Sequence, residues 1–452
     1  MKVNQREEIW REIFDGEKIP QSLDARGFAI LTAATIKNKY HQEPRLLAKI
    51  DAAEYLPEVF AQHDAAILSR TNSEYVIMRL GDKGKPLFPS LRLKDMWRTS
   101  PVFVDFRKLQ RQIATIPWEK HFTSESQALD AAVAAHILQN FVGEGQWQLT
   151  IRGRRRFQGE VPLRFRVGRN RETRILEFPA VATGFQFEVD GGYEAPRHVY
   201  LIEAKNKIQE TFNLRQVVFP YLFWTRYLRT QNVAKGVRPI FLLYTAHHYL
   251  LVELQVEEED ILNAVTVRRQ GWYVLGEPLF SHQQILEITH RLQPRFILDV
   301  PFPQADLLLR VYSLLEDLDQ EAVASGEDIA EAQRFHPRQG DYYANAARWL
   351  GWVTKVNGVF ALTPQGKKVV RASFVERVRL TLETLAQRPV FHTALRWWAT
   401  HGDVPPRQEI QGWIMKASER GQIKKSMGES TAKRRSQTVR RWLMILAPWV
   451  RS

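Results

Sequence analysis

The sequence predicts an α/β (α+β) fold in three parts, whose middle part is a mixed sheet flanked by helices. The chain has 452 residues, more than one ordinary hydrophobic core uses. Helical and strand patterns alternate over residues 111–300, whereas residues 301–452 are mainly helical in pattern. We therefore expect an N-terminal α+β domain over residues 1–110, a sheet domain over 111–300, and a helical region over 301–452 with units of about 301–375 and 376–452.

In the first part, the pattern predicts a helix over Glu7–Phe14 and a strand over Tyr75–Leu80. The segment from Gly81 to Pro86 is rich in Gly, Pro and charge, which predicts a loop.

The middle part begins with a predicted helix over Ser124–Phe141. Ser124 is a suitable N-cap, and Gln127 three residues later would complete a capping box. The helix has an apolar stripe of Leu129, Val133, Ile137 and Phe141. After this helix we expect strands over Trp147–Arg152, Leu163–Val167, Gly184–Val189, Val199–Lys205, Arg238–Tyr244 and Tyr249–Val256. A further helix is expected over Asn213–Thr230, between the fourth and fifth of these strands, with an interruption at Pro220.

Acidic residues and one lysine mark two of these strands. Strand residues two apart share a face, so Glu188 lies beside Asp190, and Glu203 beside Lys205. If the strands pair as a hairpin around Gly191-Gly192, then Asp190, Glu203 and Lys205 converge. Carboxylates of this kind suit Mg²⁺, which lowers the pKa of a bound water and neutralises charge on a phosphate. Lys205 would orient that water and stabilise the same charge.

A Glu-x-Lys tripeptide alone carries little weight, because alternating charge is often a solvated strand face. Here the preceding run, Val199-Tyr200-Leu201-Ile202, is apolar throughout and indicates a buried strand. Charges that end a buried strand need partners or a metal. This context favours a catalytic site over a structural one.

The pieces together resemble the PD-(D/E)XK nuclease superfamily, and more closely bacterial type II restriction endonucleases with C-terminal winged-helix domains. The resemblance is carried by Gln186-x-Glu188-x-Asp190-Gly191, Glu194, Leu201-Ile202-Glu203-Ala204-Lys205-Asn206, Phe212-Asn213-Leu214-Arg215-Gln216 and His41–Lys49. Val189 stands where the superfamily usually has Pro.

The resemblance also implies roles for individual residues. Asp190, Glu203 and Lys205 would be catalytic, with Glu125 of the upstream helix as a further acidic residue. The metal-binding positions would be Asp190, Glu203 and Ala204. Gln186, Glu188 and Gln216 would support the site.

Two units of the last part resemble winged helices. In the first, the helix Gln339–Leu350 precedes a short hairpin with the turn Asn357-Gly358. In the second, a basic helix over Ser430–Leu443 has Ser430 as its expected N-cap, with Ala432, Val439, Trp442 and Leu443 available for packing. Such a helix enters the major groove in many proteins, although many solvated helices look the same. The expected DNA-binding residues are Arg215, Tyr342, Arg348, Lys433, Arg434, Arg435 and Arg440. The N-terminal domain, residues 1–110, is a further candidate for DNA recognition.

Composition narrows the class of partner. Lys and Arg number 64 against 50 Asp and Glu, a formal charge of +14, which favours a polyanion. The chain has no Cys, which excludes disulfides and thiolate metal sites. His247-His248 lies in an apolar hairpin-like stretch and is interpreted as structural. We find no apolar run of membrane-spanning length and no signal-peptide pattern, so we expect a cytoplasmic protein without a membrane partner.

These features predict a type II restriction endonuclease that cuts double-stranded DNA with Mg²⁺ and acts alongside a companion DNA methyltransferase. The alternatives are a modification-dependent or repair nuclease of the same superfamily, and a non-enzymatic winged-helix DNA-binding regulator. An intact Asp190, Glu203 and Lys205 argues against the regulator. Both a homodimer and a monomer stay open, because a palindromic site favours a symmetric dimer whereas separate recognition domains suit an asymmetric site.

Overall fold

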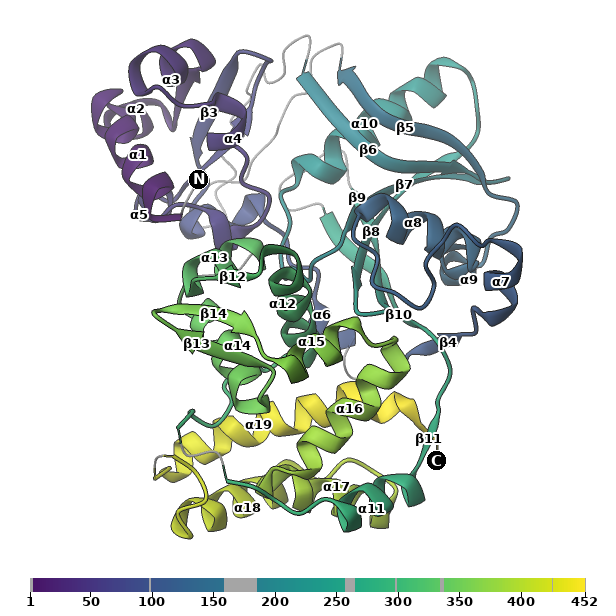
Figure 1. The fold of residues 1–452 in the computed structure, drawn as a ribbon. Coiled ribbons are helices and arrows are strands. Elements are labelled where there is room, and N and C mark those ends of the chain that lie inside the picture. Colours follow the sequence, from purple (N-terminus) through teal and green to yellow (C-terminus); the bar gives the residue numbers. More distant parts are fainter. Residues whose placement is uncertain are drawn as a thin grey trace.

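The computed structural model describes residues 3–96, 99–157, 185–256, 265–296, 299–333, 337–424 and 426–451. The N-terminal part (purple) and the central sheet (blue to teal) lie next to each other above the helical C-terminal part (green to yellow) (Figure 1).

The N-terminal part is built from short helices and an antiparallel sheet in the order β1-β3-β2. Trp10 and Phe14, four residues apart on the first helix, each pack edge-on against Phe60 at ring distances of 4.8 and 4.9 Å. The predicted first helix and the strand near Tyr75 are confirmed, but the expected loop is a 3₁₀ helix, η2 (Asp82–Leu87). The other elements are α1 (Val3–Gly16), α2 (Ile19–Arg26), β1 (Phe28–Thr32), α3 (Ala33–Tyr40), α4 (Pro44–Leu47), η1 (Ala53–Tyr55), α5 (Glu58–Gln62), β2 (Ala65–Ser69), β3 (Glu74–Arg79) and α6 (Leu93–Met96).

A seven-stranded mixed sheet in the order β4-β10-β9-β8-β7-β6-β5 forms the middle of the molecule. β5, β6 and β7 are antiparallel, and β8 runs parallel to β7. The strands are β4 (Val102–Val104), β5 (Gln148–Phe157), β6 (Phe185–Glu194), β7 (His198–Lys205), β8 (Gly236–Thr245), β9 (His248–Val256) and β10 (Val265–Leu275).

Helices cover both faces of this sheet. α8 (Glu125–Ala134) precedes β5, and α10 (Arg215–Thr230) connects β7 to β8, as a parallel pair requires. Tyr200 and Ile202 of β7 belong to the core that contains Leu129 of α8, whereas Leu201 belongs to the core that contains Val217 of α10. The run Val199–Ile202 of β7 is therefore apolar without interruption, because both faces of the strand are buried there. The predicted mixed sheet flanked by helices is confirmed, as is the order helix, antiparallel strands, helix, strand.

The predicted turn at Gly191-Gly192 is wrong, because both residues lie inside β6 and the chain turns at residues 195–197. A Cβ at Gly191 would lie 2.7 Å from Leu129 Cδ2, and one at Gly192 would lie 2.5 Å from Cβ of Ile151. The two glycines thus let α8 and β5 approach the strand closely.

Three further expectations need correction. The long helix from Ser124 breaks at His136, whose φ of 54° ends α8 before α9 (Ile137–Val142) begins. α10 continues through Pro220. The sequence pattern does not predict β10, which pairs with β9 and β4. The expected strand Leu163–Val167 lies outside the described residues.

The C-terminal part is mainly helical, with a small sheet in the order β12-β14-β13. Its described elements are α11 (His282–Arg291), α12 (Leu308–Glu321), β12 (Val323–Ala324), α13 (Gly326–Ala332), α14 (Pro337–Leu350), β13 (Val353–Val356), β14 (Val359–Leu362), α15 (Pro364–Arg371), α16 (Phe374–Ala386), α17 (Pro389–His401), α18 (Arg407–Glu419) and α19 (Glu429–Leu446). α14 and the hairpin β13–β14 have the predicted helix-and-wing shape. Asn357 (φ 50°) and Gly358 (φ 84°) supply the left-handed pair that a two-residue turn needs.

The last helix, α19, begins two residues earlier than an N-cap at Ser430 predicts. Its N-cap is Gly428 and not Ser430. Ala432, Val439, Trp442 and Leu443 are fully buried, as their spacing predicts. After α19, β15 (Val450–Arg451) pairs in parallel with β11 (Phe280–Ser281). Among the described helices, none is both long and apolar enough to span a membrane.

Candidate active site

The fork between β6 and β7 positions the predicted acidic residues. Backbone pairing of the two strands ends at Gly191 and Ile202, so Asp190 and Glu203 are the first residues past the last paired rung. At that point Asp190 Oδ2 accepts a hydrogen bond of 2.8 Å from the Ala204 amide. The carboxylate of Asp190 therefore holds the end of β7 in place of a continued strand ladder.

Glu203 and Lys205 lie side by side at the end of β7. Lys205 Nζ donates to Glu203 Oε1 at 2.6 Å and to the Ala204 carbonyl at 2.9 Å. It also lies 3.8 Å from Glu125 Oε1, at the start of α8. Ser124 caps that helix through the Gln127 amide at 3.1 Å, as predicted. The expected capping box is wrong, because the Gln127 side chain accepts from the Thr123 amide at 3.3 Å and not from that of Ser124. The cap positions Glu125 at the helix start.

Gln216, in the first turn of α10, closes the cluster from the other face of the sheet. Its Nε2 donates to Glu203 Oε1 at 2.7 Å. Glu203 Oε1 thus accepts from both Gln216 and Lys205, and both side chains hold the carboxylate in one orientation.

One ammonium faces three carboxylates at this site, and the imbalance shifts pKa values. Burial raises the pKa of Glu203 to about 7; the charges of Asp190 and Glu125 act in the same direction, while Lys205 opposes them. Burial alone would lower the pKa of Lys205, but the charges of Glu203, Glu125 and Asp190 raise it to about 12. Lys205 is therefore a cation at neutral pH, and Glu203 exchanges a proton near neutrality.

The donor set fits a hard divalent cation. Asp190 and Glu203 provide carboxylate oxygens and Ala204 provides a main-chain oxygen, the ligand chemistry of Mg²⁺, which completes its shell with waters and substrate. The excess negative charge also favours a cation. Within the described residues, no three His, Asp or Glu side chains converge closely enough to form a metal site by themselves.

Two predicted supporting residues do not join the cluster. Gln186 and Glu188 are exposed on β6, and Glu188 pairs with Arg154 Nε of β5 at 3.2 Å. Regular strand alternation predicts Glu188 on the same face as Asp190. The pairing of β5 with β6 is irregular between residues 189 and 192, so this alternation does not carry over from Glu188 to the cluster.

The N-terminal part holds the segment that follows β7. Asn213 Nδ2 donates to the Ile50 carbonyl at 2.8 Å. Arg215, expected to contact DNA, forms an ion pair with Asp51 instead of standing free. This pair lies one residue from Gln216 and hence next to the cluster.

The helix α12 of the C-terminal part lies next to both sides of the same cluster. Lys207, two residues past Lys205, pairs with Asp317. His121, four residues before Glu125, has Nδ1 3.1 Å from Glu316 Oε2. The sequence does not reveal these residues, because the partners lie far apart along the chain and leave no local pattern.

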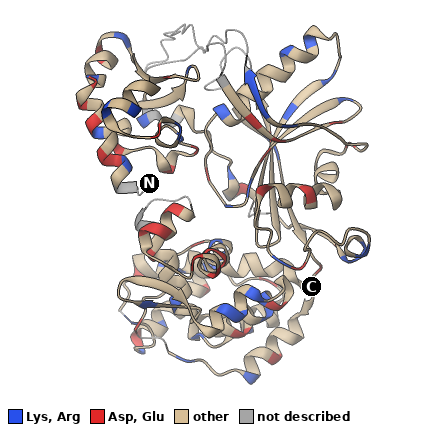
Figure 2. Ribbon diagram, turned by 45° about the horizontal axis from the view of Figure 1, so that its top comes forward, with Lys and Arg blue, Asp and Glu red and all other residues tan. Residues whose placement is uncertain are grey.

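The remaining predicted DNA-binding residues lie on α14 and α19. Tyr342 is exposed on α14, and Arg348 Nη1 donates to Asn345 Oδ1 at 3.0 Å. On α19, Lys433 and Arg434 are exposed, whereas Arg435 and Arg440 are partly buried. Lys and Arg are spread over all three parts of the chain (Figure 2).

The predicted structural role of His247-His248 is confirmed. Both rings are buried in the β8–β9 turn. His247 Nε2 lies 2.9 Å from the Trp118 carbonyl, and His248 Nδ1 lies 2.7 Å from the Ala246 carbonyl.

Comparison with known proteins finds three family models along the chain, each described as a domain of unknown function. They match residues 7–77 (DUF6996), 98–274 (DUF6997) and 310–450 (DUF7226). No curated protein and no solved structure matches.

Proposed function

We propose that the chain is a Mg²⁺-dependent endonuclease that hydrolyses phosphodiester bonds of double-stranded DNA, and within that class a type II restriction endonuclease. The observation that carries the proposal is the convergence of Asp190, Glu203 and Lys205 where the pairing of β6 with β7 ends. The helix-and-wing unit and the charge of +14 favour a duplex polyanion as the substrate.

Each residue of the cluster has a separate task. Asp190, Glu203 and the main-chain oxygen of Ala204 would hold Mg²⁺, which when bound lowers the pKa of an attacking water and neutralises charge on the phosphate. Lys205, protonated at neutral pH, donates hydrogen bonds toward the charge that develops on the phosphate oxygens. Gln216 keeps the Glu203 carboxylate oriented, and Glu125 adds negative charge beside Lys205.

Cleavage of plasmids of known sequence by the purified protein tests this proposal. We expect Mg²⁺-dependent cuts at a recurring sequence, with ends that can be mapped. Asp190→Ala and Glu203→Ala should each lower the rate by roughly 10³-fold or more, of the order expected when a charge-stabilising group is removed, while duplex binding persists.

Asp130→Asn is the matched control, because Asp130 lies on α8 but pairs with exposed Arg152 at 2.8 Å, away from the cluster. It should cut at the normal rate. Full activity of both alanine variants would overturn the site, and absence of any Mg²⁺-dependent cleavage would overturn the function. Protection of the same DNA by prior methylation would support a companion methyltransferase.

A further inference from the structure

A pocket of ≈ 530 Å³ opens in the C-terminal part, between residues 294–296, the start of α17 and the end of α18. Its size lies within the range of small-molecule sites. Phe296 and Trp413 line it, together with Lys416 and Arg420 of α18. None of the residues that line it is acidic.

The aromatic rings of this pocket are available to a ligand. Phe296 is 54 % exposed, so a ligand in the pocket can reach its ring. Trp413 is partly buried against the core. In the described part of the chain, neither ring stacks on another aromatic ring.

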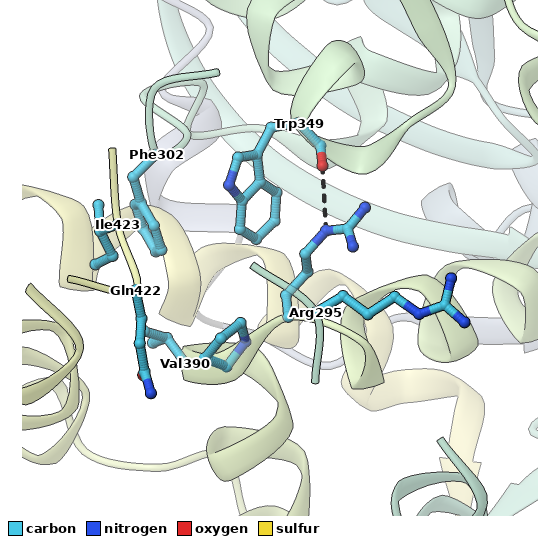
Figure 3. Close-up of a pocket in the computed structure, with 8 residues that line it drawn as sticks. Arg295, Phe302, Trp349, Val390, Gln422 and Ile423 are labelled. Atoms are coloured by element: carbon cyan, nitrogen blue, oxygen red, sulfur yellow. Dashed lines mark hydrogen bonds between the residues drawn. The ribbon is translucent and has the colours of Figure 1, made fainter. Parts of the chain in front are cut away.

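The pocket continues into a narrower one, drawn in Figure 3, which shares Pro389, Val390 and Gln422 with it. Arg295 and Arg388 line this second pocket. Arg388 is only 6 % exposed, and its Nε donates to the Trp349 carbonyl at 3.1 Å (Figure 3). Burial, together with the charge of Arg295, lowers the pKa of Arg388 to about 10.

The cations around the two pockets have no acidic partners. Among the described residues, no ion pair is formed by Arg295, Arg388, Lys416 or Arg420, although many other arginines of the same residues pair with a carboxylate. The guanidinium of Arg388 is stabilised by the Trp349 carbonyl and lies 5.3 Å from the centre of the Trp349 ring, and the like charge of Arg295 beside it makes this end of the two pockets electropositive. The N-terminus of α17, a helix of 13 residues, adds its partial positive charge beside them.

We propose that this pocket binds a nucleotide, with the base against Phe296 and Trp413 and the phosphate among Lys416, Arg420 and Arg295. Aromatic faces stack on any base, and unpaired cations track the phosphates. The nucleotide comes either from a DNA strand or from solution. The site is separate from the carboxylate cluster, so a chain that fails to cleave DNA leaves this inference standing.

Binding of a fluorescein-labelled 12-mer of thymidylate to the full chain tests the proposal, with an abasic 12-mer to report the phosphate contribution alone. We expect the thymidylate strand to bind more tightly than the abasic strand. Trp413→Ala should weaken its binding by about 5- to 150-fold, the effect of removing one base–aromatic stack. Trp413→Phe, which keeps a ring, should retain most of the affinity.

The double variant Lys416→Ala/Arg420→Ala should weaken both strands and flatten the log–log salt slope by about 0.7 for each phosphate that is no longer neutralised. Lys367→Ala/Lys368→Ala, which removes two exposed lysines of α15, is the control and should bind as wild type. Circular dichroism checks the fold of each variant.

Competition by thymidine monophosphate distinguishes a free nucleotide from a nucleotide within a DNA strand as the ligand. Competition would show that a free nucleotide suffices, and its absence would show that the nucleotide must belong to a strand. Equal affinity for the thymidylate and abasic strands, failure of the thymidylate strand to bind, or pocket variants that bind as the α15 control would overturn the proposal.

Discussion

At the scale of the residue, the protonation state of Glu203 has the largest effect on the charge of the cluster. It accepts hydrogen bonds from Lys205 and Gln216, and it lies near two other carboxylates. A single lysine leaves the cluster negative, so ionised Glu203 costs free energy until a cation arrives.

This predicts that the metal-free protein loses stability as pH rises. The pKa of Glu203 is about 7 in the fold against 4.5 for the ordinary group, so the native state binds the proton more tightly and its advantage disappears between about pH 4.5 and pH 7. The Glu203→Gln variant has no titrating group at position 203. Relative to this variant, the wild type should lose on the order of 1 to 3 kcal/mol between pH 5 and pH 8. Thermal denaturation in EDTA measures it, and a pH-independent difference would refute the shift.

Added Mg²⁺ should reverse the loss, because binding requires the ionised carboxylate. The Mg²⁺-induced rise in Tm should be larger at pH 8 than at pH 6, where Mg²⁺ affinity is about tenfold weaker because Glu203 is mostly protonated. Glu203→Gln should show little rise at either pH.

At the scale of the element, regular hydrophobic and capping patterns predict helices and strands, whereas breaks and irregular backbone conformations cannot be predicted from the sequence. The apolar run before Glu203 identified a buried strand, and Ser124 identified a helix start. The helix breaks at His136 because this residue has a left-handed backbone conformation, and no glycine stands there to indicate one in the sequence. Gly191-Gly192 looked like a turn because glycine favours turns and close packing alike, and only the position of Leu129 distinguishes the two.

The helix α12 is the element that connects the helix-and-wing unit to the cluster. Besides Glu316 and Asp317, its Arg310 donates to the Ile208 carbonyl at 3.1 Å and lies 5.9 Å from the ring centre of Tyr343 on α14. α12 thus contacts α14 on one side and the segments next to Lys205 and Glu125 on the other. If the cluster cuts DNA, this helix sets its geometry.

Asp317→Asn should therefore slow cleavage by about tenfold to a hundredfold while duplex affinity changes little, because small displacements of catalytic groups cost rate more than binding. Hydrogen exchange of residues 206–208 should also quicken, a readout that does not depend on activity. Asp319→Asn is the control, because Asp319 also lies on α12 but pairs with the exposed Arg371 of α15. Unchanged cleavage and exchange in Asp317→Asn would remove α12 from the site.

At the scale of the whole molecule, the three parts share strands and cores. β4, within residues 1–110, pairs with β10 of the central sheet, and β15 near residue 451 pairs with β11. A single apolar cluster extends from Trp10 to Trp449. Sequence patterns separate the parts by composition, but contacts between distant segments decide where one part ends, and these leave no local trace.

The surplus of positive charge leads to the last prediction, on α19. Lys433 and Arg434 are exposed there, whereas Arg441 pairs with Asp306 at 2.5 Å. If Arg434 contacts only phosphate, Arg434→Ala should weaken binding to all duplexes equally and flatten the slope of log K against log salt by about 1. If it contacts a guanine, the loss of affinity should be roughly 1 to 3 kcal/mol on the cognate duplex alone.

Binding of cognate and scrambled duplexes at two salt concentrations separates these outcomes. Arg441→Ala is the comparison, because the guanidinium of Arg441 already forms an ion pair with Asp306. Removal of the Arg441 side chain should therefore leave the salt slope closer to that of the wild type. The same measurement on Arg440→Ala covers the next turn of the helix. No change in affinity or slope for Arg434 or Arg440 would make α19 a solvated face and move duplex recognition to α14 and the N-terminal part.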